Sequence, residues 1–124
     1  MLKTKDEVKA FLQKQPNKSQ VKIELQALTK RFNELDDARH EYGRSNSILS
    51  NTVHDELGVW THHDRWPVKY KKEFLANNKK INQINDELTK IQELQIMLDE
   101  YKPIEYEQMQ IDFKSLKEQL SEFI

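Results

Sequence analysis

The chain has 124 residues, a formal net charge of −1 and no cysteine. That length fits one domain, the lack of cysteine excludes disulfides and thiolate chemistry, and the near-zero charge gives no general attraction to nucleic acid or anionic membranes. Only two glycines and three prolines stand among many Lys, Glu, Gln and Leu residues, which predicts an all-α protein forming a single helical domain over 1–124.

Two helices are expected first. Thr4 and Glu7 have capping-box spacing and open a short helix over about 5–14. Asn17 is the expected N-cap of a long helix over about 18–58. Its apolar residues recur at alternating spacings of four and three and later at multiples of seven, which is a coiled-coil heptad pattern.

The long helix contains a weak zone at 43–47, where Gly, Ser and Asn are poor helix formers. A break there is the alternative, but the heptad register continues through the zone and favours one helix. A third helix is expected over about 66–101, with Thr61 and Asp64 as candidate caps. A last heptad pattern predicts a C-terminal helix over 104–123, packed at the base of the two long helices.

Charge blocks predict that the two long helices fold into an elongated antiparallel hairpin. The net charge alternates between +5, −5, +5 and −6 over residues 1–31, 32–64, 65–80 and 81–124. A fold at 57–67 places residue i opposite roughly residue 124 − i, so that opposite blocks face each other, for example Arg31 and Glu93. The alternative is that the charged side chains only keep each helix soluble. The prediction therefore rests on the opposite signs of the blocks that face each other.

The first and last helices are expected to be much shorter than the two long ones and to lie at the base of the hairpin. The distal half of the hairpin, about 44–80, is therefore an arm that no other helix covers. Two helices cannot bury all of its large apolar residues, and an exposed apolar patch usually marks an interface. The residues expected to contact a partner are Trp60, Arg65, Trp66, Tyr70, Phe74, Ile48 and Val53. The alternative for the two tryptophans is that they close the end of the hairpin.

The histidines raise the question of a metal site. His40 followed later by the His63-Asp64 pair resembles the HD phosphohydrolases, an all-helical family, and the resemblance implies a metal-dependent hydrolase. A continuous second helix would place His40 and His54 roughly 21 Å apart, so His40 could not share an ion with the others. We therefore predict no catalytic residue, cofactor or metal; any ion would be held by His54, His62, His63 and Asp64.

Residues 65–80 combine six basic side chains with three aromatic ones, a pattern typical of nucleic-acid binding. Its alternative is a helix that balances the acidic segment opposite. Weighing these, we predict a non-catalytic, cytoplasmic protein-binding module from a bacterium or its phage or mobile elements. It would act as a regulator, adaptor or inhibitor and bind a protein partner or a second copy through 44–80, without a membrane span.

Overall fold

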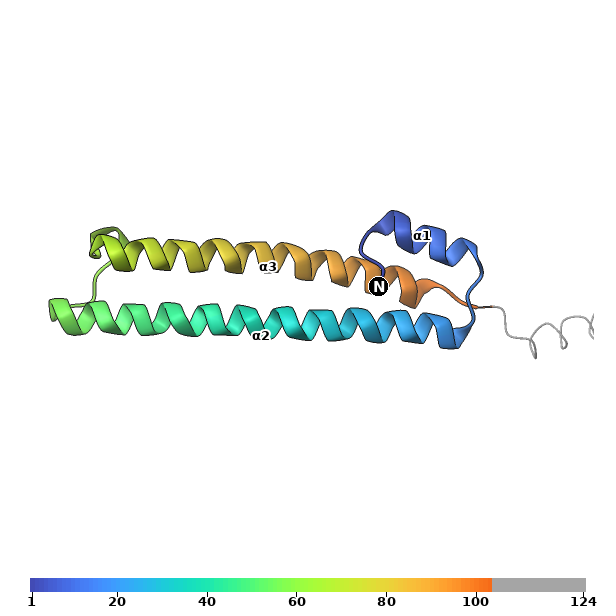
Figure 1. Cartoon of the computed structure of the whole chain (residues 1–124), viewed down its shortest axis with the longest axis horizontal. Helices are drawn as coiled ribbons and strands as arrows, with labels where there is room; N and C mark the ends of the chain where they lie inside the picture. Colours follow the sequence, from blue (N-terminus) through green and yellow to red (C-terminus); the bar gives the residue numbers. More distant parts are fainter. Residues whose placement is uncertain (104–124) are drawn as a thin grey trace, which may run out of the picture.

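A computed structural model describes residues 1–103. In that range the chain forms three α-helices and a short 3-10 turn: α1 (Lys5–Gln13), α2 (Lys18–Leu57), η1 (His63–Arg65) and α3 (Val68–Glu100). Figure 1 shows α2 and α3 as two long antiparallel rods lying side by side, with α1 against the end of α3 far from the tip. The predicted all-α hairpin is confirmed. The helix expected over 104–123 lies outside the described residues.

The first two helices begin where the capping residues predict. The Thr4 hydroxyl accepts a hydrogen bond from the Glu7 backbone N–H at 3.1 Å. At the start of α2, the side chains of Asn17 and Gln20 each accept from the other's backbone N–H at 2.9 Å. These bonds satisfy N–H groups that have no partner within the helix, which fixes both starts.

α2 runs without interruption through 43–47, so the alternative of a break there is wrong. It ends at Leu57, and the C-cap Gly58 has a φ of 74°, in the left-handed region that favours glycine. The expected caps of the third helix are also wrong: Pro67 is the N-cap of α3, and no side chain caps it. The turn η1 intervenes, and the proline carbonyl accepts from the N–H groups of Tyr70 and Lys71 instead.

Buried apolar side chains form two separate clusters. The base cluster joins all three helices and consists of Val8, Val21, Leu28, Leu35, Ile84, Leu88, Ile91, Leu94 and Leu98. The tip cluster consists of Leu49, Val53 and Trp66, with the half-buried Tyr70 and Phe74 packed against it. The buried residues of α2 follow the predicted heptad positions, which confirms the coiled-coil pattern of the hairpin.

A layer of polar side chains, the polar layer, bridges α2 and α3 between the two clusters. Asn46 Nδ2 donates to Asn78 Oδ1 at 2.9 Å, and Asn77 Nδ2 donates to Asn46 Oδ1 at 2.9 Å. Asn77 Nδ2 also lies 3.3 Å from Ser45 Oγ. Asn46 stands seven residues before Val53, at a heptad position that apolar residues take elsewhere. The weak zone of the sequence is therefore a cross-helix hydrogen-bonding site, which explains why it stays helical.

The predicted register of the hairpin is confirmed by these contacts. Asn46 faces Asn78, and Thr29 accepts a hydrogen bond from Gln95 at 3.4 Å, as a pairing of residue i with residue 124 − i requires. The individual ion pairs differ from the example given by the charge blocks. Arg31 pairs with Glu87 at 3.4 Å, and Glu93 pairs instead with Lys5 of α1 at 3.3 Å.

Candidate functional site

The hairpin tip, residues 57–68, is held by short-range hydrogen bonds. The N–H groups of Arg65 and Trp66 donate to the carbonyls of His62 and His63 at 2.9 and 3.1 Å. The Trp66 indole Nε1 donates to the Thr61 carbonyl at 3.0 Å. The connection between α2 and α3 is therefore a defined loop that fixes the direction of its side chains.

The two tryptophans of the tip have opposite environments. Trp66 is 8% exposed and packs edge to face on Phe74, with ring centroids 4.9 Å apart. Trp60 is 65% exposed, and its ring stacks on that of His54 at 4.0 Å with an interplanar angle of 24°. Trp66 thus closes the end of the hairpin, whereas the face of Trp60 that His54 does not cover remains open to a partner.

The predicted contact residues divide in the same way. Val53 is 1% exposed and Trp66 is 8% exposed, so their assignment as contact residues needs correction: both belong to the tip cluster. Tyr70 and Phe74 are half-buried against that cluster because the heptad pattern directs them toward α2. Ile48 and Arg65 are exposed, and with Trp60 they are the predicted contact residues that the structure leaves on the surface.

Large exposed apolar side chains gather in the distal half of the hairpin. Of nine such residues within 1–103, six lie between 48 and 75: Ile48, Leu57, Val59, Trp60, Val68 and Leu75. Val68 is 81% exposed and is not among the contact residues predicted from the sequence. Its exposure depends on its place in the first turn of α3, which follows from Pro67 being the N-cap of that helix. This concentration sets the distal half apart from the base.

Three of the four candidate metal ligands come together. His62 Nδ1 lies 3.1 Å from Asp64 Oδ2, and His63 Nε2 lies 3.5 Å from Asp64 Oδ1. His54 is not part of this group: it stacks on Trp60, and its Nδ1 is 3.5 Å from Asp55.

His40 lies on the same uninterrupted helix as His54, fourteen residues before it and therefore roughly 21 Å away. Its Nδ1 contacts the Asp36 carbonyl oxygen one turn earlier, at 2.7 Å. The arrangement that the HD resemblance implies needs a histidine from this position beside the His-Asp pair. A continuous α2 does not provide it.

The basic segment 65–80 is partly engaged within the chain. Lys69 Nζ lies over the Tyr70 ring at 4.6 Å from its centroid, and Lys71 Nζ is 3.9 Å from Asp64 Oδ1. The Trp66 and Phe74 rings pack on each other in the tip cluster. Base stacking needs an open aromatic face, and these rings use theirs for the hairpin.

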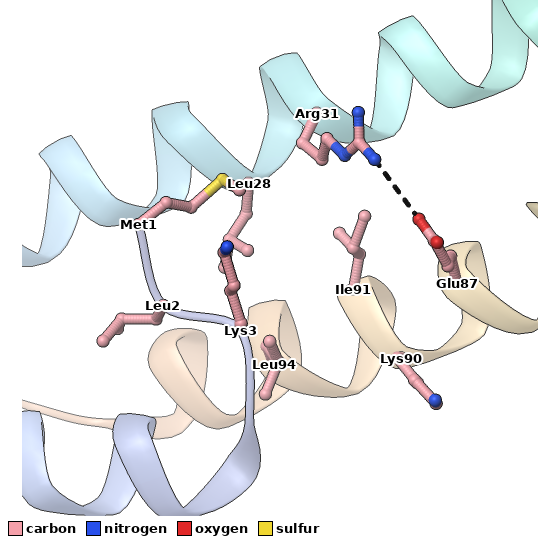
Figure 2. A pocket seen from close by; sticks show the side chains of 9 residues that line it. All are labelled: Met1, Leu2, Lys3, Leu28, Arg31, Glu87, Lys90, Ile91 and Leu94. Carbon is pink, nitrogen blue, oxygen red and sulfur yellow. Dashed lines mark hydrogen bonds and ion pairs between the residues drawn. The ribbon is translucent and has the colours of Figure 1, made fainter.

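A hollow of a different kind lies at the base, where the first three residues pass across α2 and α3 (Figure 2). Leu28, Ile91 and Leu94 form apolar walls, and the ion pair between Arg31 and Glu87 spans one edge. The cavity has a volume of about 290 Å³ and opens to solvent. No sequence motif pointed to it, because it arises from the path of the segment that precedes α1.

Within residues 1–103, no helix is both long enough and apolar enough to cross a membrane. Comparison of the chain with protein-family models, curated proteins and solved structures finds no match.

Proposed function

We propose that this chain is a non-catalytic protein-binding module that contacts a protein partner with its hairpin tip. The observation that carries the proposal is Trp60, which is 65% exposed yet held against His54 by ring stacking. Tryptophan is among the residues most enriched at binding hot spots. A side chain that is already ordered loses less conformational entropy on binding, which favours its use as an anchor.

The surroundings of Trp60 support an apolar contact with a polar edge. Val59 and Leu57 lie one and three residues before it, and both are exposed. Arg65, also exposed, supplies a cation on the same loop. Scattered apolar residues are normal on protein surfaces, but their concentration at one end is typical of an interface. We infer a partner with an apolar pocket that accepts an indole ring, and a role as regulator, adaptor or inhibitor.

Paired variants test this proposal. Trp60→Ala removes the anchor, and Ile23→Ala is the matched control, because Ile23 is 63% exposed and lies on α2 roughly 50 Å from the tip. Lysate of the source cell is passed over each immobilised chain, the bound proteins are identified by mass spectrometry, and the affinity of a captured protein is then measured. We expect capture by the unmodified chain and by Ile23→Ala, and its loss with Trp60→Ala.

Sedimentation velocity on the same three chains tests the second copy as the partner. A dimer that dissociates in Trp60→Ala, but not in Ile23→Ala, identifies self-association through the tip. A partner retained equally by both variants contradicts the proposal. Far-UV circular dichroism provides the control for folding, since both side chains are exposed and their loss should leave helix content unchanged.

A further inference from the structure

Three consecutive residues of the tip converge although the local backbone would normally separate them. Neighbouring side chains of a 3-10 turn point about 120° apart. His62 precedes the turn in an extended conformation, with φ −66° and ψ 147°, and its Nδ1 accepts from the Asp64 N–H at 3.4 Å. That contact folds the imidazole back over the turn, so that the carboxylate of Asp64 has one oxygen facing each histidine, His62 and His63.

The distances between these donors suit a single small cation. Two ligands bound at about 2.0–2.1 Å in a tetrahedral zinc site are about 3.4 Å apart. His62 Nδ1 lies 3.1 Å from Asp64 Oδ2 and His63 Nε2 lies 3.5 Å from Asp64 Oδ1, so the two imidazoles approach different oxygens of one carboxylate. One ligand atom from each of the three residues lies within 4.8 Å of the others. The side chains of His62 and Asp64 are exposed, so they are free to make the small rotations that close the set around one ion. A metal ion bound at His62 Nδ1 takes the lone pair that accepts from the Asp64 N–H and replaces that long 3.4 Å contact.

The third ligand is held in place by the tip cluster. The His63 side chain is 29% exposed and packs on the Phe74 ring at 5.0 Å between centroids, with the edge of Trp66 at 6.5 Å. Its carbonyl also accepts from the Trp66 N–H. Because packing already orders the His63 imidazole, metal binding has to order only the side chains of His62 and Asp64. The loss of conformational entropy on metal binding is therefore smaller.

We propose that His62, His63 and Asp64 form a binding site for one late first-row divalent ion, of which Zn²⁺ is the representative. Two imidazoles and one carboxylate favour Zn²⁺, Ni²⁺ or Cu²⁺ over Mg²⁺ and Ca²⁺, which prefer oxygen ligands. Three protein ligands leave one tetrahedral position to water. The site is independent of the proposed partner contact, because neither Trp60 nor the exposed apolar residues contribute a ligand.

One neighbouring charge opposes the cation and gives the site a distinctive signature. Lys71 Nζ lies 3.9 Å from Asp64 Oδ1, so its ammonium group competes with a metal ion for that carboxylate. Removing the positive charge by Lys71→Gln tightens metal binding by roughly twofold to tenfold. Adsorption of metal to a histidine far from Lys71, such as His40, would not respond to this variant, because salt screens charges over that distance.

The test is calorimetric titration of the full chain, without a polyhistidine tag, with zinc chloride. We expect one ion per chain. His63→Ala or Asp64→Asn should weaken binding by at least about tenfold, since even removal of a group that only supports a metal ligand commonly costs that much. Ni²⁺ or Cu²⁺ should bind at the same place and quench Trp66 fluorescence, because that ring lies against His63.

Matched histidine variants decide whether the ion binds at this cluster. His40→Ala and His54→Ala remove one imidazole each from outside the cluster and should leave the affinity unchanged. The proposal is overturned if zinc fails to bind at millimolar concentration, if His63→Ala and Asp64→Asn bind as tightly as the parent chain, or if His40→Ala loses binding equally. Should His63→Ala loosen the tip, the exposed Asp64→Asn and His62→Ala variants carry the test.

Discussion

The contrast between the two tryptophans gives a quantitative prediction for Trp66→Ala and Trp60→Ala. A tryptophan presents about 250 Å² of surface. With exposures of 8% and 65%, Trp66 buries about 230 Å² and Trp60 about 90 Å². At about 25 cal/mol per Å² these areas correspond to at most about 6 and 2 kcal/mol. Trp→Ala in a core typically costs about 3–5 kcal/mol, so Trp66→Ala should lie in that range and Trp60→Ala near 1 kcal/mol.

Two features make the loss of Trp66 larger than its area alone implies. Its indole N–H donates to the Thr61 carbonyl, which would lose this partner. The tip cluster has three buried members, and Trp66→Ala would leave a cavity in place of one of them. The free energy lost is therefore close to the free energy that keeps the tip folded. We expect local unfolding to be confined to the part of the hairpin between the polar layer and the tip.

Urea unfolding followed by far-UV circular dichroism measures the global cost of each variant, and amide hydrogen exchange locates the opening. In Trp66→Ala, amides near Leu49, Val53 and Tyr70 should lose protection while those near Leu28 and Leu94 keep it. Equal destabilisation by the two variants would refute the assignment of Trp66 to the core and Trp60 to the surface. Uniform loss of protection along the hairpin would refute the separation of the two clusters.

Three further predictions follow from the fold. Asn77→Leu should destabilise the chain by about 1–3 kcal/mol in urea unfolding, because it leaves the Asn46 side-chain oxygen without its donor. The double variant Asn46→Leu/Asn77→Leu should recover part of that loss, since the acceptor that then loses its donor belongs to the half-buried Asn78; additive losses would contradict the bridging role. Gly58→Ala should cost about 1 kcal/mol through backbone strain alone, since φ is 74° and a Cβ would meet no atom within 4 Å; an unchanged midpoint would contradict this. Val8→Ala, in a side chain that is 0% exposed, should cost about 1.5–3 kcal/mol and raise hydrogen exchange in α1, with the exposed Ile23→Ala as its neutral control.

The hairpin was predictable from the sequence because periodicity and charge are properties of each helix by itself. The residues Val21, Leu28 and Leu35 recur at intervals of seven residues, which indicates a buried stripe on the helix whether or not its partner helix is known. The charge blocks then supplied the register, which the pairing of Asn46 with Asn78 confirms. The salt bridges were less predictable, since an exposed Lys or Arg can reach several acids at little cost.

The tip was harder to predict because its side chains are directed by a loop. Trp60 and Trp66 look equivalent in the sequence, and their different burial depends on the left-handed Gly58 and on the turn η1. The polar layer was missed for a related reason. Asn46 is a poor helix former when only its sequence neighbours are considered. Its hydrogen-bonding partner Asn77 is 31 residues away in the sequence, and helix propensity does not take such distant contacts into account.

The polar layer also bears on how this chain could combine stability with binding. Within residues 1–103, the base cluster contains nine buried residues from three helices and the tip cluster contains three, so most of the apolar burial in this range lies on one side of the layer. Neutral hydrogen bonds between amides contribute about 1 kcal/mol each and fix register more than they add stability. Changes at Trp60 or at the His62–Asp64 cluster should therefore alter contacts at the tip while leaving the base folded. That separation makes the proposed partner contact and the proposed metal site accessible to mutation without loss of the hairpin.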